Sequence, residues 1–597
     1  MTDARYIVGI DLGTTNTVVA YIDTESDNPT PTVFEITQIT DIGVVEKLTM
    51  LPSFLYVPTE TEKPETSFAL PWGSPSDAVA GVYARKRGAQ LPQRLISSAK
   101  SWLCHASVDR TSPILPWNSP EDVQKLSPLH ASSRYLSHIK TAWDANFGKT
   151  SQLSTQDIYL TVPASFDAAS RELTVKAAEI AGLKNVTLIE EPLSAFYFWL
   201  NAHSESWRKT LKLGDIVLVC DIGGGTTDFT LIEVRDEVGE LSLHRIAVGE
   251  HILLGGDNMD LMLAYILKKK FSDSGVSLDG YQMLGLIHGA REAKESMIND
   301  AAVESYKIAV LGRGRSVVGG TIETEVSRED IEKAILDGFF PFTKIDEMPA
   351  EKRSIGFKEL GLNYATDSAV TKHLAKFLSH HSTGGTGFIR PTKILFNGGV
   401  TRASALRDRL TDVITGWLDS SDGAALTTLV GTDPELAVSQ GAACYGYTKR
   451  GSGIRVRGGA GRSYYIGIEA AMPAVPGMEL PVKALCVCPI GMEEGTDVSV
   501  PGQEFGLVVG EQVKFRFFSS TVRKDDAVGD LLDEWLSDEI EELAPIEAEL
   551  PVEENVGALI PVTLHAYLTE VGTLSIFCES TDGKNRWKLE FNARDEG

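Results

Sequence analysis

The sequence predicts an α/β protein in which a two-lobed domain is followed by a β-sandwich domain. Three observations lead to this prediction. The length of 597 residues exceeds what one compact domain usually holds. One strand–turn–strand motif occurs near Tyr6 and again near Ile216. Alternating strands and helices give way near Lys449 to a β-rich segment, which indicates a change of architecture.

The composition is that of an ordinary soluble protein, with 43% apolar and 23% charged residues. A formal charge of −26 repels nucleic acid phosphates and anionic lipid, which excludes generic binding to either. We find no apolar run near the ~20 residues that span a bilayer. The start at Met1 lacks a cationic segment followed by an apolar core. We therefore expect a cytoplasmic protein with no nucleic acid and no membrane partner.

Several competing motifs are too incomplete to predict a site. The six cysteines are too sparse for a disulfide framework, and Cys486 and Cys488 lack a second pair for zinc. Gly148–Thr150 has the end of a P-loop without its upstream glycine. His373 and His380–His381 have no carboxylate or cysteine at ligand spacing. We expect ordinary structural residues at all of these positions.

The most informative element is a strand–turn–strand motif that occurs twice. In Tyr6–Tyr21, apolar β-branched runs flank a Gly-Thr-Thr-Asn turn, which predicts a hairpin. Ile216–Val234 repeats the order strand, Asp, aliphatic residue, glycine turn, Thr and strand. The repetition indicates two related lobes, each with one loop in a shared cleft.

Between and after these hairpins the pattern alternates. Ala168–Ala181 predicts a helix that stops at Gly182, and a short strand from Val186 is broken by Pro192 before helix-forming residues. A strand and glycine turn follow at Ile394–Arg402 before a helix begins at Ala403. This alternation is typical of an α/β architecture.

The character of the chain changes after residue 449. We expect residues 1–449 to form the first domain, the Gly/Arg-rich residues 450–462 a linker, and residues 463–597 a β-sandwich. Six strands are predicted in that last domain: Tyr464–Ile468, Phe505–Val509, Val513–Phe518, Ile560–Tyr567, Thr573–Phe577 and Trp587–Phe591.

An acidic insert interrupts the predicted sandwich. Residues 525–554 hold thirteen acidic residues and no Lys or Arg. Such blocks are usually solvated, so we expect a loop or a short acidic helix. The alternative is a regulatory or partner-binding segment.

The paired turns suit the binding of a triphosphate. A Gly-Thr-Thr turn directs backbone N–H groups and hydroxyls into one concavity, and glycine avoids a Cβ that would block close approach. The carboxylates of Asp11 and Asp221 would repel phosphate, unless a divalent cation such as Mg²⁺, with its waters, sits between them and the phosphates. A third glycine turn, Gly398–Gly399, strengthens this interpretation.

Five motifs in order resemble the nucleotide-binding domain of the seventy-kilodalton heat-shock chaperones, within the actin-like ATPase superfamily. They are Ile10–Asn16, Thr161–Phe166, Ile189–Pro192, Asp221–Thr226 and Asn397–Arg402. The resemblance spans roughly Tyr6 to Tyr447. More faintly, the segment from Ile560 resembles the end of the family's β-sandwich substrate domain.

The resemblance implies ATP/ADP and Mg²⁺ as cofactors and assigns roles to residues. Lys100 would neutralise charge that builds on the γ-phosphate, and Glu191 would help to position the attacking water. Asp221 and Thr226 complete the catalytic set, Asp11 and Asp221 hold Mg²⁺ through water, and Pro163 and Arg171 relay the nucleotide state. The implied nucleotide-binding residues are Gly13, Thr14, Thr15, Asn16, Gly223, Gly224, Gly225, Thr226, Gly255, Gly256, Asp257, Lys294, Gly398, Gly399 and Arg402.

The chain also departs from the family pattern. Arg291 stands where relatives usually have glutamate, and residues 343–390 carry an apparent insertion. The linker is Gly/Arg-rich, where the family's is short, apolar and acidic. No helical segment follows the β region before Gly597, so we expect a member without the helical lid. Bound peptide should then exchange quickly, because closure normally slows dissociation.

The first hypothesis is an ATP-dependent chaperone, an ATPase whose β domain binds unfolded or apolar peptide segments under nucleotide control. The resemblance implies a J-domain cochaperone and a nucleotide-exchange factor as further partners. The alternative is a nucleotide-gated adaptor with slow hydrolysis that holds one dedicated partner through its acidic segment. A sugar kinase of the same superfamily is disfavoured, because it would leave the β domain unexplained.

Overall fold

The structure, a computed structural model of the whole chain, describes residues 4–592 except for 63–67, 74–76, 106–107, 205, 238–239, 251, 301, 312–320, 351–361, 363, 381–386, 419–425, 452–455, 461, 470–480, 502–503, 511, 521, 524, 537–538, 544 and 551–557. The chain divides into two compact units, Met1–Arg455 and Val456–Gly597. Residues 452–455 and 461 of the predicted linker lie outside the described residues, so the linker stays a prediction.

The first hairpin of the first unit lies at the centre of a sheet with the order β11-β10-β1-β2-β3, in which β6 also pairs with β2. Strands β1 and β2 are antiparallel, as their apolar runs on either side of the glycine turn predict. Strand β10 is parallel to β1, and β11 is parallel to β10. The bounds are β1 (Tyr6–Leu12), β2 (Asn16–Asp23), β3 (Thr32–Val33), β6 (Met50–Pro52), β10 (Asp157–Val162) and β11 (Val186–Glu190).

The second hairpin is built into its sheet in the same way. Within the first unit this sheet has the order β18-β17-β12-β13-β14, with β17 parallel to β12 and β13 antiparallel to β12. The predicted repetition of one motif in two lobes therefore has a structural counterpart. The bounds are β12 (Ile216–Ile222), β13 (Thr227–Glu237), β14 (Glu240–Val248), β17 (Lys393–Asn397) and β18 (Thr427–Thr428).

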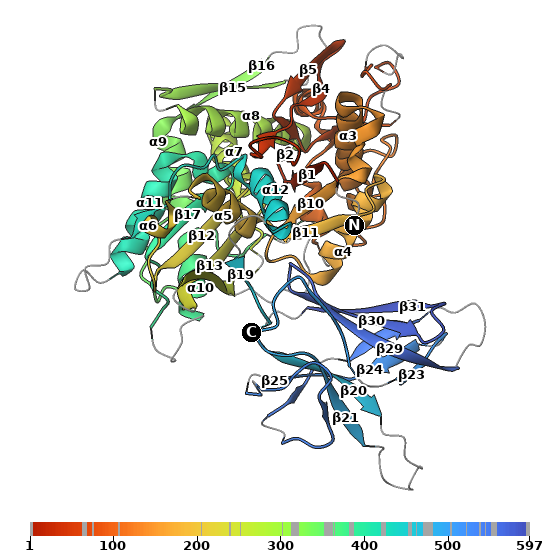
Figure 1. Cartoon of the computed structure of the whole chain (residues 1–597). Helices are drawn as coiled ribbons and strands as arrows, with labels where there is room; N and C mark the ends of the chain where they lie inside the picture. Colours follow the sequence, from red (N-terminus) through yellow and green to blue (C-terminus); the bar gives the residue numbers. More distant parts are fainter. Residues whose placement is uncertain are drawn as a thin grey trace, which may run out of the picture. The chain divides into compact units, whose positions relative to one another are not determined.

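Helices α5 (Glu191–Ala202) and α12 (Ala437–Lys449) pack closely against each other and lie side by side in Figure 1. A Cβ added to Gly441 of α12 would meet the Ser194 carbonyl oxygen of α5 at 1.7 Å. Helix α12 also packs on β1, where a Cβ on Gly9 would meet the Ser439 carbonyl oxygen at 2.1 Å. Glycine is required at both contacts because the backbones approach so closely. The start of α5, which carries Glu191, is thereby held in a fixed place.

The remaining elements of the first unit complete the α/β architecture, which confirms the predicted class. The strands are β4 (Ile36–Asp41), β5 (Val44–Leu48), β7 (Leu55–Tyr56), β8 (Val79–Ala80), β9 (Leu95–Ile96), β15 (Ser305–Leu311) and β16 (Thr321–Ser327). The α-helices are α1 (Val82–Gln90), α2 (Ala99–Leu103), α3 (Pro128–Phe147), α4 (Ala168–Ile180), α6 (Trp207–Thr210), α7 (Gly256–Asp273), α8 (Gly280–Asn299), α9 (Arg328–Ile331), α10 (Val370–His380) and α11 (Ser404–Trp417). The short turns are η1 (Pro92–Arg94), η2 (Lys149–Ser151), η3 (Leu153–Thr155), the π-helical η4 (Glu332–Asp337) and η5 (Gly399–Arg402).

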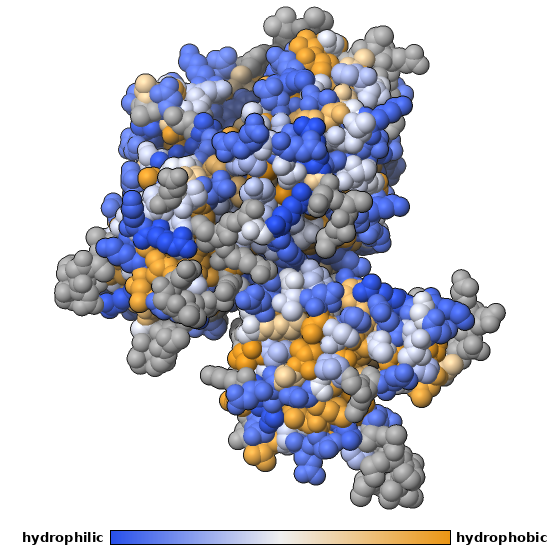
Figure 2. Space-filling model, in the orientation of Figure 1, coloured by the Kyte–Doolittle hydropathy of each residue, from blue (hydrophilic) through white to orange (hydrophobic). Residues whose placement is uncertain are grey.

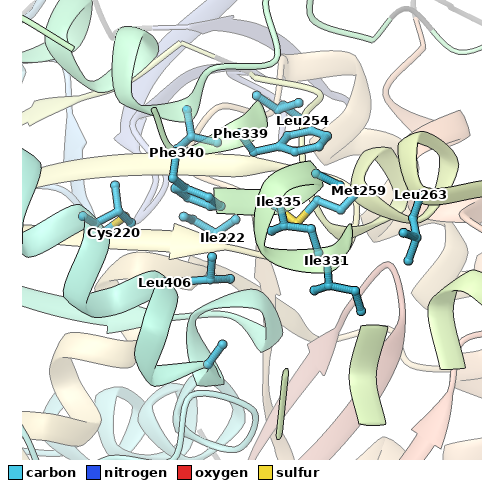
Figure 3. Packing of buried hydrophobic residues seen from close by; sticks show 14 of the residues in the cluster. Cys220, Ile222, Leu254, Met259, Leu263, Ile331, Ile335, Phe339, Phe340 and Leu406 are labelled. Atoms are coloured by element: carbon cyan, nitrogen blue, oxygen red, sulfur yellow. The ribbon is translucent and has the colours of Figure 1, made fainter. Parts of the chain in front are cut away.

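Each lobe of the first unit has its own buried apolar cluster. In the second lobe, Cys220 and Ile222 of β12 pack with Met259 and Leu263 of α7, and Figure 3 shows part of this cluster with Phe340. These side chains are buried because β12 is apolar along almost its whole length, as expected for a strand covered on both faces. The carboxyl end of β12, which carries Asp221, is therefore fixed by the core beneath it.

Among its described residues, the second unit contains two five-stranded sheets with the orders β26-β21-β20-β25-β27 and β22-β29-β30-β31, where β23 also pairs with β29. A two-stranded sheet joins β24 to β28. Side chains of both larger sheets, including Ile466 and Leu564, share one buried cluster. The bounds are β19 (Val456–Arg457), β20 (Ser463–Glu469), β21 (Val482–Cys488), β22 (Thr496–Ser499), β23 (Phe505–Val508), β24 (Gln512–Phe515), β25 (Phe517–Ser520), β26 (Leu531–Leu532), β27 (Glu541–Glu542), β28 (Ile546–Glu549), β29 (Leu559–Leu568), β30 (Thr573–Ser580) and β31 (Arg586–Asn592).

Two predictions for the second unit are wrong. The run Val513–Phe518 is not one strand, because β24 pairs with β28 while β25 pairs with β20. The described part of the acidic insert is neither a simple loop nor a helix, because it contributes β26, β27 and β28. In both places the deciding factor is a pairing partner that lies far away in the sequence, which no local pattern reveals.

Among the described residues, we find no helix that is long and apolar enough to cross a membrane. The six cysteines, all of them among the described residues, form no disulfide with one another.

Candidate functional site

A cavity of about 450 Å³ lies in the first unit where the two hairpin turns and the Gly398–Gly399 turn come together. Most of the predicted site residues line it: Asp11, Gly13, Thr14, Thr15, Asn16, Lys100, Glu191, Asp221, Gly223, Gly224, Thr226, Gly256, Asp257, Lys294, Gly398, Gly399 and Arg402. Gly225, Gly255, Pro163 and Arg171 do not line the cavity. Residues from seven separate sequence segments therefore meet at one place.

Asp11 and Asp221 lie at equivalent points of the two lobes, near the ends of β1 and β12. The Asp11 carboxylate accepts a hydrogen bond from Thr161 Oγ1 of the parallel neighbour β10 at 3.2 Å. The Asp221 carboxylate accepts one from Asn397 Nδ2 of the parallel neighbour β17 at 2.8 Å. Each acid is thus held by a polar side chain at the carboxyl edge of its own sheet, where parallel strands commonly form binding sites.

Lys100 and Glu191 form a buried ion pair at the cavity wall. Lys100 lies on α2 and Glu191 is the first residue of α5, and their side chains are 10% and 12% exposed. The Lys100 ammonium also lies 6.0 Å from the centre of the Phe166 ring. Since one charge of this pair compensates the other in a desolvated place, removing either would leave an uncompensated charge.

The carboxylates of the cavity are difficult to ionise together. Burial raises the pKa of Asp11 to about 7, the charge of Glu191 adds to this rise, and Lys100 opposes it. Burial likewise raises the pKa of Asp221 well above its ordinary value, and that of Glu191 is also raised. Burial opposes the charge of Lys100, yet Glu191 and Asp11 raise the pKa of this lysine above its ordinary value. Lys100 therefore interacts with more acids, namely Glu191, Asp11 and Asp221, than its one charge neutralises.

This excess of acid fits a hydrated divalent cation. Among the described residues, no group of three or more His, Cys, Asp and Glu side chains is placed to hold a metal directly. Asp11 and Asp221 nevertheless line the same cavity. Mg²⁺ usually keeps several waters and takes few protein carboxylates, so contacts through water suit this pair.

The glycines of the second turn make room for the first turn. A Cβ on Gly224 would lie 2.0 Å from Thr15 Oγ1, and one on Gly225 would lie 3.0 Å from Thr14 Cγ2. A Cβ on Gly255 would meet the Gly223 carbonyl oxygen at 2.6 Å. Gly225 and Gly255 thus support the shape of the turns without lining the cavity.

The wall formed by α7 and α8 carries a compact charge network. Arg291 contacts Asp257 at 2.5 Å and Asp260 at 2.6 Å, and Lys294 contacts Asp260 at 2.6 Å and the Gly256 carbonyl oxygen at 3.0 Å. Burial alone would raise the pKa of Asp260, but Lys294 and Arg291 hold it below its ordinary value. Two predicted binding residues, Asp257 and Lys294, are therefore engaged with other side chains.

At the third turn, Arg402 pairs with Glu435 at 2.8 Å and remains half exposed. The apolar side chains of Ile298, Val400 and Pro434 line the same cavity. This end of the cavity combines apolar surface with a few polar groups, as is usual in small-molecule sites.

The predicted relay residues lie apart from the cavity lining. Arg171 of α4 is buried and its Nη2 donates to the Ala164 carbonyl oxygen at 3.1 Å, one residue after Pro163. Arg171 thereby fixes the segment that follows β10. Ser165 in the same segment donates to Asp228 of β13, which connects it to the second lobe.

Sequence reasoning did not assign roles to Asn397, Thr161, Ser98 or Arg291. Asn397 and Thr161 fall at the ends of strands next to the two hairpins, so the carboxyl-edge rule for parallel sheets was the available signal. Ser98 donates to Asp257 at 2.8 Å and thereby connects the segment before Lys100 to α7. No local pattern identifies this contact, because its partners are 159 residues apart.

Comparison with known proteins gives a consistent result. The family model described as Hsp70 protein matches residues 83–339. The chain is similar to the chaperone protein DnaK of Stenotrophomonas maltophilia, at 27% identity over 286 residues that cover 46% of this chain and 39% of the relative. It is also similar to a chaperone protein HscA homolog of Pseudoalteromonas atlantica, at 27% identity over 337 residues that cover 53% of this chain and 47% of the relative.

The resemblance to the seventy-kilodalton heat-shock chaperones is confirmed by these matches. The chain spans less than half the length of the two curated relatives. Residues 83–339 include Lys100, Glu191 and the turn at Asp221–Thr226, whereas the turns after Asp11 and Asn397 lie outside the matched range.

Proposed function

We propose that this chain, which carries an Hsp70 segment at residues 83–339, is an ATP-dependent chaperone. ATP would bind and be hydrolysed in the cavity of the first unit, and this cycle would control the binding of unfolded or apolar peptide segments by the second unit. The observation that supports the proposal most strongly is the convergence of three glycine turns and the Lys100–Glu191 pair on one cavity.

In this proposal the two hairpin turns, one from each lobe, would bind the phosphates on opposite sides. Their backbone N–H groups and the hydroxyls of Thr14, Thr15 and Thr226 are suitable donors to phosphate oxygens. Lys100 would shift part of its interaction from Glu191 to the γ-phosphate, where negative charge builds during transfer. Glu191, partly released, would accept a hydrogen bond from the attacking water and orient it. The apolar end with Ile298 and Val400 would hold the base.

We further propose Mg²⁺ as the cofactor, held through water by Asp11 and Asp221. When bound, the ion would supply positive charge that offsets the phosphates and the buried carboxylates. Thr161 and Asn397 would keep both carboxylates in place for it.

The second unit is proposed to be a substrate-binding β-sandwich. Support comes from its two sheets around one buried cluster and from the strands on its surface that an extended peptide could join. On the face shown in Figure 2, apolar residues are more frequent on this unit than on the first. A J-domain cochaperone and a nucleotide-exchange factor are proposed as further partners from the family resemblance.

A single-turnover ATPase assay on the full chain tests the proposal. For Lys100→Ala we expect hydrolysis to fall by about 100-fold or more, the effect of losing one preorganised charge, with ATP affinity changed little. Thr226→Ala should also slow hydrolysis. The matched control is Lys86→Ala. Lys86 is an exposed lysine on α1 that donates to the Thr40 carbonyl oxygen at 3.3 Å, and the variant should behave like the wild type.

The same assay with a panel of unrelated apolar peptides separates the two candidate functions. Acceleration by several peptides supports the chaperone. Hydrolysis that responds to no peptide favours the nucleotide-gated adaptor. Loss of ATP binding in Lys100→Ala, rather than loss of hydrolysis, would contradict the catalytic role.

A further inference from the structure

Part of the acidic insert crosses one face of a sheet in the second unit. We call residues 526–542, described except for 537–538, the acidic strap. Its strand β26 pairs with β21 at one edge of the sheet, and its strand β27 pairs with β25 at the other edge. Strand β20 lies between β21 and β25, as Figure 1 also shows. Residues 533–536, 539 and 540 therefore lie in the sequence between these two edge pairings.

The strap covers the face of the sheet that is turned away from the main core. Along β20, Tyr464 and Ile466 belong to the cluster shared with the other sheet, whereas Tyr465 belongs to a separate cluster. Successive side chains of a strand point to opposite faces, so this second cluster lies on the opposite face. The cluster consists of Tyr465, Ala484, Cys486, Phe518 and the strap residue Ile540, with Trp535 packed against it.

Two strap side chains act as apolar anchors on this face. The Trp535 ring lies 5.4 Å from the Phe518 ring in an edge-to-face arrangement. Ile540 is 4% exposed. Gly467 leaves the space that Phe518 needs, because a Cβ there would lie 3.2 Å from Phe518 Cε2. The face is thus shaped to receive an aromatic and an aliphatic side chain.

Four basic side chains of the second unit pair with acids of the strap. The pairs are Arg462–Glu541 at 3.3 Å, Lys483–Asp533 at 2.6 Å, Arg516–Glu542 at 2.7 Å, and Arg523 with Asp526 at 2.7 Å and Glu539 at 3.3 Å. The charge of the strap is therefore complementary to the charge around the surface that it covers.

We infer that this face is a binding surface for an extended acidic peptide with one aromatic and one aliphatic anchor, and that the strap occupies it in the free chain. The inference rests on the proposal that the second unit binds peptides, and it names the class of peptide. The strap itself shows the mode of binding: short strand pairing at both edges, two apolar anchors and flanking acids.

The contacts of the strap are unequal in strength, so one end can open. Asp533 and Glu541 are 73% and 70% exposed, and exposed ion pairs contribute little to stability. At the other end, Asp526 accepts hydrogen bonds from Tyr465 Oη at 2.6 Å and from two nitrogens of Arg523 at 2.7 and 2.9 Å. Asp526 would remain attached while residues 531–542 leave, which makes a local opening less costly than unfolding of the unit.

The test is the binding of a fluorescent synthetic peptide with the sequence of residues 530–543 to the full chain. In the variant Asp533→Asn/Glu541→Gln/Glu542→Gln the strap keeps its apolar anchors but loses three ion pairs. We expect this variant to bind the peptide about 10-fold more tightly than the wild type, because the open state is more populated. A control with the same change in net charge is Asp497→Asn/Glu579→Gln/Asp582→Asn, whose acids lie elsewhere in the unit and should leave affinity unchanged.

Several outcomes would overturn the inference. An equal gain in peptide affinity in both variants would mean that the effect comes from net charge alone. Equal affinity for a scrambled peptide would mean that the surface does not recognise the order of the residues. Binding of apolar peptides without any effect of the strap substitutions would overturn the inference and leave the proposed function standing. If no peptide binds any variant while ATP still binds, the proposed peptide-binding function fails as well.

A measurement on the wild type does not depend on the folding of any variant. Saturating peptide should displace the strap and accelerate amide hydrogen exchange at Leu531–Leu532 and Glu541–Glu542, with exchange in β29 and β30 unchanged. Unchanged exchange in the strap at saturation would contradict displacement.

Discussion

The two hairpins of the first unit share a backbone plan but differ in their side chains. The first turn carries Thr14, Thr15 and Asn16, whereas the second has glycines at the positions equivalent to the two threonines. The distances explain the difference, because a Cβ on Gly224 or Gly225 would enter the space of the threonines opposite. The first turn therefore supplies threonine hydroxyls, and the glycines of the second turn leave room for these threonines.

The strands beside the turns differ as well. Asp11 faces Val18 across its hairpin, whereas Asp221 faces a second acid, Asp228. Burial raises the pKa of Asp228, although Ser165 from the first lobe opposes this by donating a hydrogen bond. The second lobe thus contains more buried acid and depends more on hydrogen bonds from its neighbours. The two copies of the motif thus share one strand–turn–strand arrangement but differ in the buried charge around them. Four predictions test this difference between the lobes.

The largest effect on stability is expected when the charge of Asp11 is removed. The measurement uses the chain without nucleotide and with a chelator present. Because the pKa of Asp11 is raised to about 7, the folded state prefers the protonated acid. This contribution is fully present at low pH and is lost as the pH rises from about 4 to about 7, by at most about 4 kcal/mol. Asp11→Asn should therefore stabilise the chain at pH 8 much more than at pH 5, as measured by urea unfolding.

The corresponding substitution Asp221→Asn should change stability in the same direction, since the pKa of Asp221 is also raised. A stabilisation by Asp11→Asn that does not depend on pH would contradict the raised pKa.

A second prediction concerns the turn after β17, which has no glycine counterpart after β10. Gly398 has φ of 84°, and a Cβ there would lie 2.3 Å from the Ile222 carbonyl oxygen. Gly398→Ala should destabilise the chain by about 3 kcal/mol through backbone strain and overlap. Gly399→Ala is the matched control, because its nearest contact would be Glu435 Oε1 at 3.8 Å. Similar unfolding midpoints for both variants would be inconsistent with this geometry.

A third prediction compares the first glycine of each turn. A Cβ on Gly13 would lie 2.2 Å from the Asn16 carbonyl oxygen, whereas one on Gly223 would be no closer than 3.7 Å to Thr226 O. Gly13→Ala should therefore cost about 2 kcal/mol of stability without nucleotide, and Gly223→Ala little. Unfolding measured by circular dichroism decides this, and equal losses would show that the two turns are equally tight.

The smallest expected effect is the difference in stability contributed by the hydrogen bonds to Asp221 and to Asp11. Asn397→Ala removes a 2.8 Å bond to Asp221, and Thr161→Val removes a 3.2 Å bond to Asp11. Since bonds to charged groups are stronger when short, Asn397→Ala should cost about 1 kcal/mol more than Thr161→Val. Urea unfolding of both variants at pH 8, where the acids are more ionised, measures the difference. A larger loss for Thr161→Val would reverse the assigned order.

Much of the first unit could be predicted from the sequence, because its signals are local. The hairpins at Tyr6 and Ile216 follow from apolar runs around a glycine turn, and α4 follows from its apolar spacing and Gly182. The shared cavity was also predicted, since a repeated motif implies paired loops. The break between β24 and β25 and the strands of the acidic insert were missed, because strand pairing joins residues that are distant in the sequence.

The sequence by itself determined the position of the turns, because their glycines provide backbone flexibility and their threonines provide hydroxyls. Only the tertiary structure decided which partner each charge meets. Asp257 is joined to both Ser98 and Arg291, and acids of the strap pair with basic side chains from distant segments such as Lys483. The physical reason is that local conformation depends on neighbouring residues, whereas burial and ion pairing depend on segments that only folding brings together.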